Sequence, residues 1–209
     1  CMSVAGTAEA YSNTPFPPTA DMHNFNEYGF CTNTDGTGTG TCNAYEPATE
    51  VTAENYGALG VSADHVGYHA IANPGQLWWF ACYVNGNSPD GGRSAMEFHH
   101  DTPGGVLTAD IDMSRAPDGV NWIPIGGKVP DSESQNFRAG RRFGGSFDGG
   151  GHTIKNLTHT IEDDYVLSEF ESYRFFGIIG TCGSYSDTVI KDLTIENFTV
   201  TTDALYAGL

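Results

Sequence analysis

The densest group of side chains that could do chemistry is formed by Glu97, His99, His100 and Asp101. In an extended segment His99 and Asp101 share one face and His100 points away. Glu97, His99 and Asp101 are therefore a candidate acid–base or metal-binding loop site. The surrounding sequence SPDGGRSAMEFHHDTPGG is typical of loops and turns, so we favour solvated loop residues over a site.

A second group has the residue types of carbohydrate-cleaving enzymes. Glycoside hydrolysis needs two carboxylates across a groove, and polysaccharide lyase chemistry needs a basic residue with calcium. Asp148, Asp192, Lys155 and Lys191 supply both types. The two lysines fall at matching places of an internal repeat, however, which a scaffold explains without any chemistry.

A third group lies in the segment TNTDGTGTGT, which resembles a calcium loop. Asn33 and Asp35 place oxygens at alternate positions, but only one of them is a carboxylate, and a tight calcium site uses several. Cys31 and Cys42 flank this loop and are the pair we expect to form a disulfide. With His23 they could instead ligate zinc, which normally takes four ligands. Calcium, zinc and a disulfide-closed polar loop all stay open, and we favour the last.

The stretch from Phe143 to Val200 organises the chain because its second half restates its first. We align residues 154–158 (IKNLT) with residues 190–194 (IKDLT), where apolar and polar side chains alternate as in half-buried strands. Each copy follows a corner rich in Gly or in Gly and Ser. A single unit of this kind cannot bury its own apolar face, so repeated units are expected to stack as a solenoid.

Elements upstream of the repeat suggest how the stack begins. A helix is predicted from Asn73 or Pro74 to a stop at Gly86, and it could cover the open end of the solenoid. Its adjacent Trp78 and Trp79 could alternatively form a platform for stacking carbohydrate, although neighbouring helical residues point in different directions. The segment VLTADIDMS is expected to be one strand.

These patterns predict an all-β fold: a right-handed parallel β-helix, or solenoid, with a short N-terminal capping helix and an irregular N-terminal region. Residues 1–66 form the irregular acidic region with its disulfide loop. Residues 67–209 form the capped repeat domain, which we expect to be incomplete at its C-terminal end.

Composition limits the partners. The 209 residues carry a formal net charge of −17, which disfavours a phosphate-binding surface for nucleic acid. No run of about 18 apolar residues occurs, so no membrane span is predicted. Of the five cysteines, Cys82 and Cys182 are expected to be buried thiols. Cys1 could be a lipid-bearing first residue or a fragment boundary.

A family resemblance rests on an ordered set of motifs. YHAIANPGQLWWFACYVN, VLTADIDMS, WIPIG, FDGGGHTIKNL, FFGIIG and YAGL follow one another from about Tyr68 to Leu209. This order resembles bacterial cell-surface proteins with GLUG repeats. The element around His23, Cys31, Cys42 and Tyr45 is also similar to one that precedes the repeats in that family. The resemblance implies a parallel β-helix on a bacterial surface, in proteins described as adhesins, and supplies no catalytic residues.

The expected function is that of a non-catalytic, exported surface protein, acting as adhesin, scaffold or filament-forming subunit. It would be extracellular or on a bacterial cell surface. Its partners would be a host or cell-surface glycan or protein, or further copies in a head-to-tail homo-oligomer. One alternative is a β-helix carbohydrate-active enzyme, a polysaccharide lyase or hydrolase. Another is a calcium-stabilised binding module; no cofactor other than calcium is expected.

Overall fold

A computed structural model describes residues 24–32, 45–85, 103–118, 122, 124–126, 143–160, 177–180 and 188–201. The elements of this part of the chain are short. In order they are β1 (Thr49–Glu50), η2 (Ala63–His65), β2 (His69–Ile71), α1 (Pro74–Val84), β3 (Gly105–Leu107), β4 (Ile111–Asp112), η3 (Met113–Arg115), β5 (Phe147–Asp148), β6 (Thr153–Lys155), β7 (Thr158–Thr160), β8 (Ile190–Lys191), β9 (Thr194–Glu196) and β10 (Thr199–Thr201).

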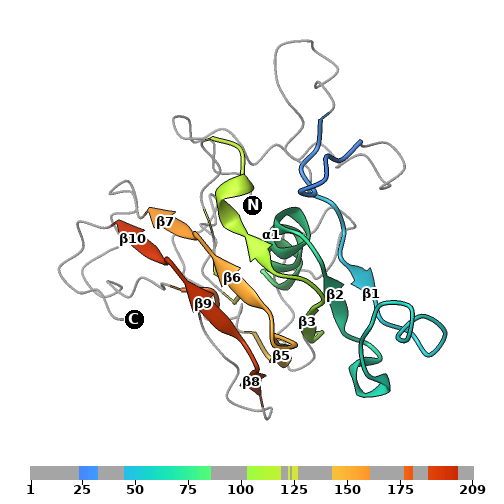
Figure 1. Cartoon of the computed structure of the whole chain (residues 1–209). Coiled ribbons are helices and arrows are strands. Elements are labelled where there is room, and N and C mark those ends of the chain that lie inside the picture. Colours follow the sequence, from blue (N-terminus) through green and yellow to red (C-terminus); the bar gives the residue numbers. More distant parts are fainter. Residues whose placement is uncertain are drawn as a thin grey trace, which may run out of the picture.

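Within these residues the strands pair mostly in parallel. One sheet has the order β1-β2-β3-β5-β8, another has the order β4-β6-β9, and β7 pairs with β10. Only the β1–β2 pair is antiparallel. Figure 1 shows β8, β9 and β10 side by side with β5, β6 and β7, so residues 143–160 and 188–201 form neighbouring layers.

The prediction of an all-β, right-handed parallel β-helix is contradicted. The described residues form mixed and parallel sheets of strands two or three residues long, together with one buried helix, and they contain no closed solenoid. The physical reason is that the interior is not built from strands alone. Helix α1 supplies Leu77, Trp78, Phe80 and Val84 to the same core as the strand residues.

The predicted alignment of the repeat is also wrong. Ile154 pairs with Ile195, and Ile190 pairs with Phe147. The repeated unit is thus TIKNLT at 153–158 and TIENFT at 194–199. Asn156 and Asn197 occupy matching positions in this register, and both have left-handed backbone angles, with φ of 58° and 52°. Asparagine tolerates that conformation better than most residues, so a turn at the same place keeps both copies in step.

The single strand expected from VLTADIDMS divides into β3 and β4, with a bend at residues 108–109. Leu107, Ile111 and Met113 are buried. The Thr108 backbone N–H donates to the Ile71 carbonyl at 2.9 Å and so closes the ladder of β2 and β3 before the bend.

The predicted helix is confirmed as α1. Asn73 is its N-cap, in extended conformation, and accepts a hydrogen bond from the Gln76 backbone N–H at 2.9 Å. Pro74 stands at the first helical position, where a missing N–H costs nothing. Every residue of α1 except Tyr83 is buried, because the N-terminal segment covers the side that the sheets leave open.

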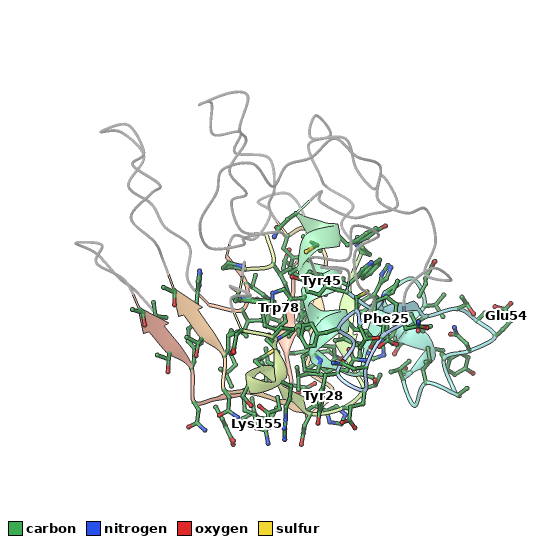
Figure 2. All side chains as sticks on the ribbon, turned by 90° about the horizontal axis from the view of Figure 1, so that it is seen from above. Phe25, Tyr28, Tyr45, Glu54, Trp78 and Lys155 are labelled. Atoms are coloured by element: carbon green, nitrogen blue, oxygen red, sulfur yellow. The ribbon has the colours of Figure 1, made fainter. Side chains whose placement is uncertain are left out.

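The two adjacent tryptophans of α1 belong to the core. Trp78 lies 6.3 Å from Tyr45 in a stacked arrangement and 5.2 Å from Trp122 edge to face, measured between ring centroids. Figure 2 shows Tyr45 and Trp78 close to each other. Trp78 and Trp79 are only 2% and 4% exposed. Neither ring offers a face to a sugar, so a carbohydrate platform at this pair is wrong.

The N-terminal segment is tied closely to α1 and to the first sheet. The Gly75 backbone N–H donates to the Tyr28 carbonyl at 2.8 Å. A Cβ atom on Gly75 would overlap the Gly29 backbone, so a residue without a side chain is required at this contact. Strand β1 pairs with β2 across the predicted boundary at residue 66.

Candidate functional site

The structure describes few of the candidate site residues. Cys31 is half-buried and forms an isolated antiparallel bridge with Phe25. Seven other candidates lie outside the described residues, namely His23, Asn33, Asp35, Cys42, Glu97, His99 and Asp101. The Cys31–Cys42 disulfide, the calcium loop and the loop site therefore stay predictions.

The most developed group of charged side chains surrounds Asp148, and we call His65, Asp148 and Lys191 the Asp148 cluster. Asp148 ends β5, directly before the turn of residues 149–151. The Gly150 backbone N–H, at a φ of 57°, donates to the Asp148 Oδ1 at 2.8 Å. This hydrogen bond holds the Asp148 Oδ1 against the backbone of the turn.

The other carboxylate oxygen receives two side chains from distant segments. Lys191 of β8 pairs with Asp148 in the sheet, and its Nζ lies 3.0 Å from the Asp148 Oδ2. His65, at the end of η2, places its Nε2 2.8 Å from the same oxygen. Asp148 is 4% exposed, and the Lys191 side chain is 55% exposed. The cluster thus joins η2, β5 and β8 around one buried carboxylate.

Burial and hydrogen bonding act in opposite directions on the Asp148 pKa. Desolvation by burial raises this pKa, but the hydrogen bonds from the Gly150 N–H, His65 and Lys191, with the charge of Lys191, outweigh it and lower the pKa below its usual value. The hydrogen bond and charge of Asp148 in turn raise the Lys191 pKa. Both shifts favour the ionised pair.

This geometry suits cross-strand attachment better than proton transfer. A general acid or base must present a titrating atom to substrate, and both Asp148 oxygens are already hydrogen-bonded. The second ring nitrogen of His65, Nδ1, is buried and has no hydrogen-bond partner among the described residues.

A shallow hollow of about 630 Å³ lies beside the cluster. Its lining is mostly polar and consists of Asp148, Gly150, Gly151, Asp192, Leu193 and Thr194. Asp192 is exposed and has a φ of 50°, whereas the Asp148 carboxylate is held by its own partners. Within the part of the chain that the structure describes, no three His, Cys, Asp or Glu side chains gather as metal ligands.

A second polar feature runs across three strand layers, and we call Asp112, Asn156 and Asn197 the Asn ladder. Asn156 Nδ2 donates to Asp112 Oδ1 at 2.9 Å. Asn197 Nδ2 donates to Asn156 Oδ1 at 3.2 Å. The hydrogen bond from Asn156 is the main cause that lowers the Asp112 pKa. Each Asn side-chain amide therefore donates a hydrogen bond to a side chain of the preceding strand layer.

Sequence reasoning found part of these features. Asp148 and Lys191 were named as residues of a suitable type, but His65 and the Asn ladder were missed. The supposed equivalence of Lys155 and Lys191 is wrong, because Lys155 pairs with Glu196. The recurrence of Thr-Ile-x-Asn at 153–156 and 194–197 was the signal that could have given the correct register.

Cys82 differs from its predicted state. It is 3% exposed on α1, as expected for a buried thiol, but it is disulfide-bonded. The disulfide attaches the central helix to a second part of the chain.

No family model matches this chain, and neither a curated protein nor a solved structure shows significant similarity to it. The resemblance to GLUG-repeat proteins accordingly stays a prediction. In the described part of the chain, α1 is too short to cross a membrane, and no other helix there is long and apolar enough to do so.

Proposed function

We propose that the protein is a non-catalytic, exported surface protein that acts as a scaffold or adhesin. The observation that carries this proposal is the state of Asp148. This buried carboxylate is the strongest described candidate for acid–base chemistry, yet the Gly150 N–H, His65 and Lys191 occupy both of its oxygens. Its charge is used to hold segments together.

The proposed export is supported by the disulfide of Cys82. Disulfides persist in oxidising compartments and at cell surfaces and are rare in reducing cytosol. The resemblance to bacterial surface proteins with GLUG repeats favours the same location. The acidic composition, with a formal net charge of −17, suits a soluble outer surface and disfavours nucleic acid as a partner.

The proposed partners are a surface glycan or a protein, including further copies of the chain in a head-to-tail assembly. Edges of strands with unpaired backbone groups are established sites for pairing with other chains. Among the described strands, β8, β9 and β10 each stand at the end of a sheet.

The experiment that tests the proposal asks for catalysis directly. The full chain is incubated with acidic and neutral polysaccharides, with and without calcium, and the release of reducing or unsaturated ends is followed. We expect no product above the level of a heat-treated sample. Turnover that is lost in Asp148→Asn, Asp192→Asn or His99→Ala would overturn the proposal and favour the carbohydrate-active enzyme.

A further inference from the structure

We draw no further inference here: the strongest candidate, the sheet edge formed by β8, β9 and β10, where Ile190 and Ile195 are each 47% exposed, carries nothing because nothing in the structure shows what covers it.

Discussion

At the scale of single residues, Asp148 shows how one buried charge is stabilised. Removing an ionised partner from such a cluster leaves polar groups without their hydrogen bonds, and this costs more than the net gain of an average hydrogen bond. His65 Nε2 and Lys191 Nζ both approach the same oxygen, within 2.8 and 3.0 Å. The strength of the cluster therefore depends on the negative charge and not only on the shape of the side chain.

We predict that Asp148→Asn lowers the free energy of unfolding by about 1–3 kcal/mol at neutral pH. Because the folded-state pKa of Asp148 is below its unfolded value of about 3.9, the stabilisation is fully present above about pH 4. It is lost as the pH falls through the folded pKa. Urea denaturation of both proteins between pH 2 and 7 should show the two stabilities converging in acid.

The control for this change is Asp118→Asn, at an exposed position. It should leave the free energy of unfolding at neutral pH nearly unchanged. A gap between wild type and Asp148→Asn that stays constant down to pH 2 would contradict the assigned role of the carboxylate.

Asn156 combines two requirements in one side chain, a left-handed backbone angle and two hydrogen bonds of the ladder. We predict that Asn156→Ala is less stable than Asn156→Gly by about 1 kcal/mol, because only alanine adds strain at positive φ. Both variants lose the ladder contacts. Equal free energies of unfolding for the two variants in chemical denaturation would show that the positive φ of residue 156 does not affect stability.

At the scale of elements, the turn of residues 149–151 sets how closely two layers approach. The Gly149 backbone N–H donates to the Lys191 carbonyl at 2.8 Å. A Cβ on Gly149 would overlap the Asp192 carbonyl oxygen, which is backbone and cannot move by a change of rotamer. The glycine therefore lets the β5 layer and the β8 layer stack at the distance that their hydrogen bonds require.

We predict that Gly149→Ala destabilises the protein by roughly 1–3 kcal/mol, since the layers must separate locally to admit the methyl group. Gly57→Ala is the matched control, because nothing lies within 4 Å of a Cβ at that glycine. Thermal melting should show a lower Tm for the first variant only. Similar Tm values for the two variants would contradict close backbone packing at the turn.

At the scale of the whole molecule, the core joins a helix to three sets of strands. The helix α1 packs against the N-terminal segment through Phe30 and Tyr45 and against later segments through Trp122 and Phe143. A disulfide at Cys82 fixes this central helix to another segment. Cross-links of this kind stabilise mainly by reducing the freedom of the unfolded chain.

We predict that Cys82→Ala lowers the free energy of unfolding by about 2–4 kcal/mol under oxidising conditions. Reduction with a thiol should lower the Tm of the wild-type protein more than that of the variant, because the variant has already lost this bond. If wild type and variant have the same Tm both before and after reduction, then a disulfide at Cys82 does not stabilise the protein.

Local sequence determined the features that depend on neighbouring residues. Asn73 and Pro74 specify the start of α1 because a capping side chain and a fixed φ act within one turn. The sequence of residues 143–200 likewise indicated that a repeat is present.

Tertiary structure decided the features that depend on which distant segments meet. The register that joins Ile154 to Ile195 could not be chosen from the sequence, because IKDLT at 190–194 offers a competing match to IKNLT. His65 has no signal of its own and gains its role only when η2 is placed beside β5. The burial of every α1 residue except Tyr83 depends on the N-terminal segment packing over the helix, which is a property of the assembled core and not of the helical period.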